Sequence, residues 1–176
     1  MKIVRFAQMK EGIHINNEII YLLPNGKTLF IRPECIDKMQ KYRQVKRNDT
    51  EAGGILIGRI LIENGHYIID EVSEPMTTDK RRRTYFKRNM EGHQEFFNSI
   101  WDREVGSCFY LGEWHTHPEN NPTPSSIDWK NWNRLKRIGF ESECLFFIIV
   151  GINEMKVWYS EKNSKIIELR RRSSFG

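Results

Sequence analysis

The chain has 176 residues, of which 39% are hydrophobic, 29% charged and 12% aromatic, and its formal net charge is +5. This length allows one domain with a sizeable core, and the charge is mild for a protein whose main partner is nucleic acid. Neither the opening Met1–Arg5 nor the longest apolar run, Leu145–Val150, predicts a signal peptide or a membrane span. The cysteines are far apart, odd in number and lack a Cys-x-x-Cys pair. They predict reduced thiols, so we expect a cytoplasmic protein. Because no membrane span is predicted and the charge is mild, we expect neither a membrane nor a nucleic-acid partner.

Strand-like runs and turn signals alternate in the first part of the chain. Apolar runs predict strands over Ile19–Leu23, Thr28–Arg32, Gly53–Ile62 and His66–Val72. Pro24-Asn25-Gly26 joins the first two runs, and Asn64-Gly65 predicts a β-hairpin between the last two. Between these pairs, apolar residues at near-helical spacing predict a helix from about Glu34 to Lys46.

Two helices and four strands are predicted in the remainder. A regular apolar face over Gly92–Arg103 predicts an amphipathic helix. Pro124-Ser125 predicts the start of a second helix, which ends at about Arg137 or Ile138, before Gly139. Strands are predicted over Cys108–His117, Leu145–Val150, Met155–Tyr159 and Ile166–Leu169. The basic segment Asp79–Arg88 has little periodicity and is predicted to be a loop.

Taken together, these elements predict one α/β domain over residues 1–169, with a mixed, mostly antiparallel sheet flanked by helices. The last residues, 170–176, begin with three arginines and predict a flexible basic C-terminal tail.

A pair of histidines closes the predicted strand Cys108–His117. Alternate side chains of a strand leave on the same face, so His115 and His117 can meet one cation while Thr116 points away. Two imidazoles, one carboxylate and an open position are what a catalytic zinc (Zn²⁺) requires. We expect Asp128, in the first turn of the following helix, to be the third protein ligand.

Ser125 and Asp128 also fit a purely structural role. Ser at the N-cap with an acidic residue three positions later is a capping box, which starts many helices without further function. The two roles are compatible, because an ionised Asp128 would offset the electrostatic conflict between a metal ion and the positive end of a helix. Ser125 would then stand at the helix entry, with its hydroxyl available to a developing oxyanion.

A hydrolytic zinc site also needs a general base. Glu113 lies two residues before His115 on the same strand face, where a ligand role or a supporting role behind a ligand suits it better. Glu51 precedes Gly53-Gly54, and adjacent glycines allow a close backbone approach. Spacing alone leaves both candidates open.

Glu51 before Gly53–Gly58, His115-Thr116-His117-Pro118, and Pro124-Ser125-Ser126-Ile127-Asp128 together resemble the JAMM metalloprotease family, also called JAB/MPN. The likeness covers roughly residues 30–160. It implies a JAB/MPN-type fold and a zinc isopeptidase that removes ubiquitin or a relative of ubiquitin from target proteins. It also implies that His115, His117 and Asp128 bind zinc, that Glu51 is the general acid/base and that Ser125 steadies the tetrahedral intermediate. Inactive scaffolding members of the family lose these residues, whereas this chain keeps them.

The segment Leu111–Pro118 further resembles small prokaryotic JAB proteins of mobile elements and anti-phage operons. In the CBASS version, such a protein removes conjugates that an E1–E2-type ligase places on the C-terminus of a cGAS-like nucleotidyltransferase. The resemblance therefore implies a protein substrate whose flexible C-terminal tail carries the scissile bond, with that nucleotidyltransferase and ligase as partners.

A local run of basic residues lies within Asp79–Arg88 and contains Tyr85-Phe86. Such a run is most often a solvated loop, and this is our interpretation. The alternative is a docking loop for an acidic face of the substrate protein or for nucleic acid, with the aromatic pair as anchors.

Four rival functions share part of this pattern or fold. A DNA-associated protein of the RadC type shares the JAB fold but differs in sequence after the second histidine. A zinc nucleobase deaminase needs His-x-Glu and Pro-Cys-x-x-Cys, and neither is present. Amidohydrolase barrels use His-x-His but need about 250 residues. A non-catalytic adaptor with this fold is disfavoured by the complete set of site residues.

Overall fold

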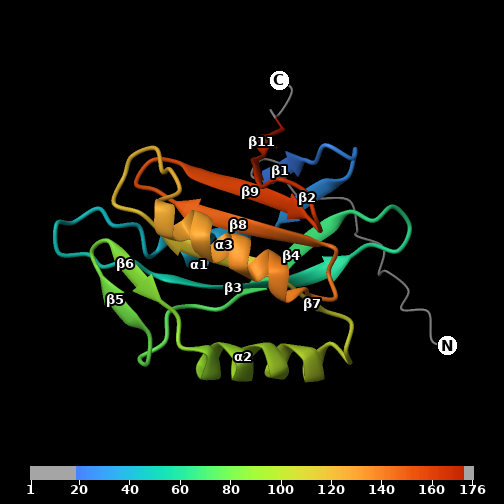
Figure 1. The fold of residues 1–176 in the computed structure, drawn as a ribbon. Helices are drawn as coiled ribbons and strands as arrows, with labels where there is room; N and C mark the ends of the chain where they lie inside the picture. The colour runs from blue at the N-terminus through green and yellow to red at the C-terminus, as the bar shows by residue number, and fades with distance from the viewer. Residues whose placement is uncertain (1–18, 173–176) are drawn as a thin grey trace, which may run out of the picture.

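The computed structural model describes residues 19–172 and shows one large sheet with three helices packed against it (Figure 1). Within those residues the sheet has nine strands, in the order β10-β9-β8-β7-β3-β4-β2-β1-β11. The strands are β1 Ile19–Leu22, β2 Thr28–Ile31, β3 Gly53–Ile60, β4 Tyr67–Val72, β7 Phe109–Thr116, β8 Cys144–Val150, β9 Met155–Glu161, β10 Ile167–Glu168 and β11 Arg170–Arg171. The helices are α1 Pro33–Gln40, α2 Met90–Arg103 and α3 Ser126–Ile138.

Most neighbouring strands of the sheet are antiparallel, as the sequence predicts. Only β2 with β4 and β7 with β8 run parallel among the described strands. Both expected hairpins, β1–β2 and β3–β4, are present. The expectation of a mixed, mostly antiparallel sheet flanked by helices is therefore confirmed.

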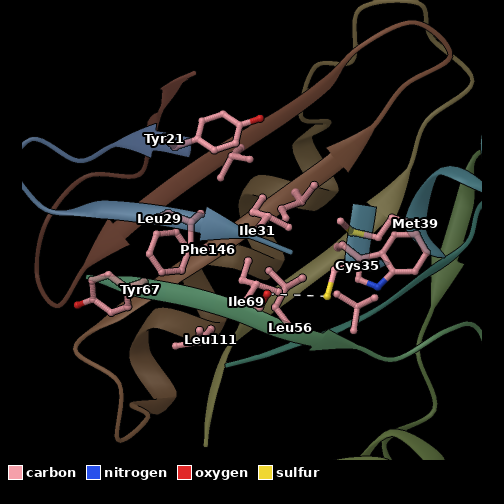
Figure 2. Packing of buried hydrophobic residues seen from close by; sticks show 14 of the residues in the cluster. Tyr21, Leu29, Ile31, Cys35, Met39, Leu56, Tyr67, Ile69, Leu111 and Phe146 are labelled. Carbon is pink, nitrogen blue, oxygen red and sulfur yellow. Dashed lines mark hydrogen bonds between the residues drawn. The ribbon is translucent and has the colours of Figure 1, made fainter. Parts of the chain in front are cut away.

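The core has a layer on each side of the sheet. Side chains of α1 pack with one face of the strands, as Figure 2 shows around Cys35 and Met39. Helices α2 and α3 cover the opposite face: Ile100 packs with β3, and Trp132 packs with β8 and β9. Strand β8 is buried on both faces and supplies alternate residues to the two layers, Phe146, Ile148 and Val150 to one and Leu145, Phe147 and Ile149 to the other.

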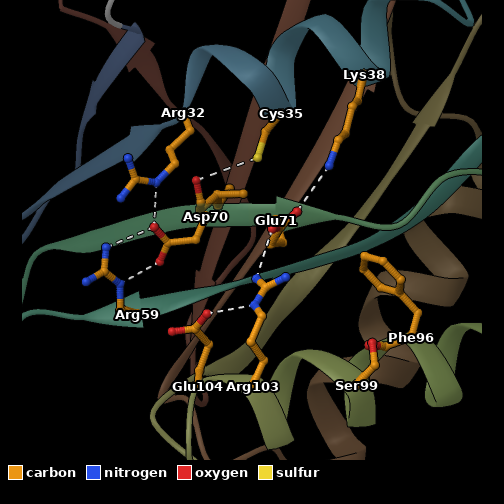
Figure 3. Close-up of polar contacts among 11 residues, drawn as sticks. Arg32, Cys35, Lys38, Arg59, Asp70, Glu71, Phe96, Ser99, Arg103 and Glu104 are labelled. Carbon is orange, nitrogen blue, oxygen red and sulfur yellow. Dashed lines mark hydrogen bonds and ion pairs between the residues drawn. The ribbon is translucent and has the colours of Figure 1, made fainter.

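Ion pairs on β4 connect the sheet to two of the helices (Figure 3). The carboxylate of Glu71 accepts from Lys38 of α1 at 3.1 Å and from Arg103 of α2 at 3.0 Å. Asp70 accepts from both Arg32 and Arg59. These groups are partly exposed, so each pair contributes modestly, about 0–1 kcal/mol.

Helix α1 is shorter than expected, because it ends at Gln40 instead of continuing to Lys46. The fully buried side chain of Gln44 donates to the carbonyls of Asp49 and Arg83. These two hydrogen bonds, together with one from the Lys46 backbone N–H to the Asp49 carboxylate, favour a turn over a further helical turn. The apolar spacing that predicted a longer helix included Val45, but this side chain is 65% exposed and does not continue the buried face of α1.

The predicted loop Asp79–Arg88 is wrong, since this segment forms a two-stranded hairpin of β5 (Lys80–Arg82) and β6 (Tyr85–Lys87). Arg81 and Phe86 face the protein, and their neighbours on each strand face solvent. The hairpin is attached to the main sheet region by a hydrogen bond from the Glu51 N–H to the Arg82 carbonyl, 2.8 Å long. The alternation is hidden in the sequence because the inward-facing Arg81 is charged like its neighbours and the outward-facing Tyr85 is aromatic like Phe86.

The expected tail also starts too early. Arg170 and Arg171 form β11 and pair with Leu22 and Tyr21 of β1. The buried Leu169 fastens this segment to the core, which explains why the chain stays in the sheet. Residues 1–18 and 173–176 lie outside the described residues, so the extent of the domain and of any tail stays a prediction. No helix within 19–172 has the length and apolarity needed to cross a membrane.

Candidate metal centre

His115 and His117 converge on one point at the end of β7. Their Nε2 atoms are 3.0 Å apart, and both rings are buried. The carboxylate of Asp128 closes the group, with Oδ1 3.2 Å from Nε2 of His115 and Oδ2 3.4 Å from Nε2 of His117. One potential ligand atom from each residue lies within 4.8 Å of the others. Two imidazoles and a carboxylate gathered in this way can hold a metal ion and leave a coordination position open.

Thr116 points away from the two histidines, as the alternation of a strand predicts. Its hydroxyl accepts from the Ala52 N–H at 3.0 Å and donates to the Gln44 amide oxygen at 3.1 Å. The histidine segment is thus fixed to the residues that precede β3 and to the turn after α1. No sequence pattern indicates this role of Gln44, because an isolated glutamine in a polar segment is usually exposed.

The capping box predicted at the start of α3 is present. The Asp128 N–H donates to Ser125 Oγ at 3.2 Å, and the Ser125 N–H donates to Asp128 Oδ2 at 2.6 Å. Ser125 Oγ also donates to the same carboxylate oxygen at 2.7 Å. These contacts hold the Asp128 carboxylate against the histidines, so the same side chain caps α3 and is a candidate metal ligand.

The charges of the group favour an ionised carboxylate. Burial opposes ionisation of Asp128, but hydrogen bonds from His115 and His117 outweigh it and hold the pKa of Asp128 well below its usual range. Burial likewise opposes a charged His117, and the hydrogen bond and charge of Asp128 outweigh it, so the pKa of His117 is raised. A carboxylate that attracts positive charge this strongly suits a cation site.

Glu51 lines the same cleft as the three candidate ligands and is 7% exposed. Burial raises its pKa from 4.5 to about 7, although the neighbouring histidines lower it. Its backbone is held by the hairpin, because Arg81 Nε donates to the Glu51 carbonyl at 2.7 Å. A carboxyl group that titrates near neutral pH can both accept and return a proton.

Glu113, the other candidate base, is engaged elsewhere. Its Oε2 accepts from Arg88 at 2.9 Å, and both side chains are mostly buried. This ion pair joins β7 to the end of the hairpin and places the Glu113 carboxylate against a guanidinium. The geometry therefore separates two glutamates that spacing alone left equivalent.

Residues 39–161 match the family described as prokaryotic homologs of the JAB domain. The chain belongs to this family. The resemblance that the histidine, serine and aspartate motifs carried is thereby confirmed, and so is the expected fold class.

Curated relatives extend the likeness of this JAB domain. It is 35% identical to a "CD-NTase/cGAS isopeptidase" of Escherichia coli over 83% of this chain and 89% of the relative. Proteins of the same name from Pseudomonas aeruginosa and Vibrio cholerae are 34% and 31% identical, over 76% and 85% of this chain and 83% and 92% of theirs. These relatives and the family confirm the expected enzyme class, an isopeptidase or peptidase.

A solved structure supports the fold alone. The solution structure of a Desulfitobacterium hafniense protein superposes with a TM-score of 0.50 at 22% identity, covering 78% of this chain and 87% of that one.

The candidate centre opens into a large cleft of about 1280 Å³. The cleft is bounded by β6, by α2 and by α3, and its floor is β7. Aromatic side chains are prominent along it: Tyr110 of β7 stacks on Phe140 with ring centroids 4.5 Å apart, and Phe97 stacks on Trp101 at 6.0 Å. A JAB domain with this cleft can admit an extended peptide segment to the histidines.

Proposed function

We propose that this JAB domain is a zinc-dependent isopeptidase that releases a protein conjugated to the C-terminal tail of a cGAS-like nucleotidyltransferase. One observation carries the proposal: two histidines, an ionised carboxylate and a glutamate with a pKa of about 7 line the same cleft. The relatives named CD-NTase/cGAS isopeptidase, similar over most of their length, supply the substrate class.

His115, His117 and Asp128 are the residues that would hold the metal. Their donor set, two imidazole nitrogens and one carboxylate, is that of a catalytic zinc site with an open position. Zinc, when bound, supplies a Lewis acid that polarises the scissile carbonyl and activates water near neutral pH.

Glu51 is the residue that we assign to proton transfer. The attacking water must lose a proton as its oxygen bonds to the scissile carbonyl carbon, and the departing lysine amine must gain one as the C–N bond breaks. A single carboxyl group with a pKa of about 7 can do both in turn. No covalent enzyme intermediate is required. The free, buried cysteines Cys35, Cys108 and Cys144 are accordingly given no chemical role.

Ser125 is assigned to the oxyanion. Its side chain is at the entry to α3 and is exposed to the cleft, which it helps to line. The hydroxyl proton now directed at Asp128 can turn toward the carbonyl oxygen as negative charge develops there. Removing one such donor typically lowers the rate about 10²–10³-fold.

The biological setting follows from the substrate. A ligase of the E1–E2 type would form the conjugate, and this enzyme would reverse it in the cytoplasm of a bacterium that carries a CBASS anti-phage operon. The buried, free thiols suit a reducing compartment. A full set of site residues favours this function over a non-catalytic adaptor or a RadC-like DNA-associated protein.

The proposal is tested with a cGAS-like nucleotidyltransferase joined through its C-terminal carboxyl to a lysine of a carrier protein. Wild type should release the nucleotidyltransferase and lose this activity with a zinc chelator. Glu51→Gln should keep zinc yet slow release by about 10²–10⁴-fold, the usual contribution of general acid–base catalysis. The exposed Lys162→Gln serves as a control and should cleave normally. Normal release by Glu51→Gln would contradict the assignment.

A further inference from the structure

One end of the molecule carries a dense basic surface that the proposed chemistry does not use. It consists of exposed side chains from the β5–β6 hairpin and from the turn after α1: Lys46, Arg47, Lys80, Arg82, Arg83 and Lys87. The two segments are joined because Arg83 Nη1 donates to the carbonyls of Lys46 and Arg47 at 3.0 and 2.7 Å. Figure 1 shows the hairpin and this turn at the same end of the molecule.

The cations of the basic surface have no ion-pair partner within residues 19–172. None of its six cations forms an ion pair there, although eight ion pairs of Lys or Arg with a carboxylate occur elsewhere in that part of the chain. The neighbouring Asp49 carboxylate is occupied by the Lys46 backbone N–H. Moreover, Lys80 lies directly opposite Lys87 across the hairpin. A like-charge cross-strand pair destabilises a hairpin, so the fold tolerates this surface at a cost.

The basic surface is connected to the candidate metal centre through the protein. Hydrogen bonds run from Thr116, between the two histidines, to Gln44, and from Gln44 to the Arg83 carbonyl. Strand β6 also forms a wall of the cleft. A partner bound to the hairpin would therefore hold its tail beside the cleft mouth without disturbing the site.

Two apolar side chains lie within this basic surface. Val45 is 65% exposed and Tyr85 is 38% exposed. Apolar or aromatic anchors inside a charged rim are typical of protein–protein interfaces, where complementary charge accelerates encounter. This combination favours a folded protein over nucleic acid as the occupant.

We propose that the basic surface docks an acidic face of the folded nucleotidyltransferase, so that the enzyme recognises the folded body of its substrate as well as the tail that carries the scissile bond. This inference rests on the proposed function. It predicts that cleavage of an intact conjugate depends on charge and ionic strength, whereas cleavage of an isolated tail does not.

The test compares the folded conjugate with a short peptide of the same tail sequence joined to lysine. The variant is Lys80→Glu/Arg82→Glu, whose side chains face solvent outside the cleft. Because Lys80→Glu creates an opposite-charge pair with Lys87, the hairpin should become more stable. Unfolding of the hairpin would therefore not explain a loss of conjugate cleavage. Lys162→Glu/Lys165→Glu makes the same change of charge on the exposed turn after β9, beside the last turn of α3.

We expect Lys80→Glu/Arg82→Glu to lower kcat/KM for the folded conjugate about tenfold or more at low salt, mainly through KM. Peptide cleavage should equal that of wild type, and the charge-matched control should be unaffected. Equal cleavage of the conjugate by variant and wild type would overturn the docking proposal while leaving the isopeptidase intact. If wild type cleaved neither substrate, the proposed function itself would fail.

The remaining alternative is that the basic surface binds nucleic acid. A binding assay with single- and double-stranded DNA and RNA over a range of salt concentrations distinguishes it from protein docking. Nucleic-acid binding that the variant loses, together with unchanged conjugate cleavage, would assign the basic surface to phosphate contacts and overturn the proposal. Absence of such binding, with impaired conjugate cleavage, would support it.

Discussion

At the scale of single residues, the surroundings of each carboxyl group determine the role that it can take in the site. Glu51 and Glu113 both line the cleft, yet Glu113 forms an ion pair with Arg88, whereas burial dominates the surroundings of Glu51. Burial thus keeps the Glu51 carboxyl protonated to about pH 7, while Asp128 is held ionised by the histidines. Pairs of carboxyl groups whose pKa values are pushed apart are a usual arrangement for acid–base catalysis.

The raised pKa of Glu51 predicts a pH-dependent cost in stability. Its pKa is about 7 in the folded chain against an ordinary 4.5, so between these values the folded state binds the proton that the unfolded state has released. Stability therefore falls as pH rises through this window. In the presence of chelator, Glu51→Gln should melt higher than wild type at about pH 8, by on the order of 5 °C. At about pH 5 the two should melt nearly together.

The control for this comparison is Glu113→Gln, which leaves Arg88 without its partner and should lower the melting temperature at both pH values. A difference between Glu51→Gln and wild type that stays constant with pH would show that the Glu51 carboxyl titrates normally.

At the scale of secondary-structure elements, β7 positions the site through one glycine. Gly112 has a φ of 136°, and a Cβ there would lie 1.8 Å from the Phe146 carbonyl oxygen. The β3–β7 register shifts beside it, because Leu56 faces Gly112 while Ile57 faces Tyr110. This bulge sets the phase in which His115 and His117 face α3.

We predict that Gly112→Ala destabilises the protein by about 4 kcal/mol or more, since the backbone of β8 cannot move away from the added methyl group. Gly139→Ala is the matched control, with a φ of 76° but nothing within 4 Å of the added Cβ. It should cost about 1–3 kcal/mol from backbone conformation alone. Urea unfolding of both variants checks this, and equal losses would show that the close approach to Phe146 is relieved easily.

The sequence predicted the elements that have a regular apolar pattern and missed those held by polar contacts. Both sheet hairpins, α2 and α3 follow from periodicity and turn residues. The early end of α1 depends on the buried amide of Gln44, and β5–β6 depends on hydrogen bonds to Thr50 and Glu51. Most of these contacts join segments far apart in the chain, so a local sequence pattern cannot predict them. The site motifs were visible because ligand spacing on a strand is a local property.

At the scale of the whole molecule, the candidate centre is assembled from residues that are distant in the sequence. The histidines close β7, Asp128 begins α3, and Glu51 precedes β3 at the base of the hairpin. A metal ion bound by the folded state alone would tie β7 to α3 and stabilise the protein. The same layout places the basic surface next to the aromatic cleft, because Lys87 of β6 belongs to the basic surface and also lines the cleft.

The central claim is that His115, His117 and Asp128 form a zinc site, and the amount of zinc per chain tests it most directly. Purified wild type and His117→Ala should be compared after reconstitution with zinc and removal of the excess. We predict one equivalent in wild type and essentially none in a folded His117→Ala, because two remaining ligands do not make a zinc site. Well-folded wild type that retains no zinc, or a variant that retains a full equivalent, would contradict the account.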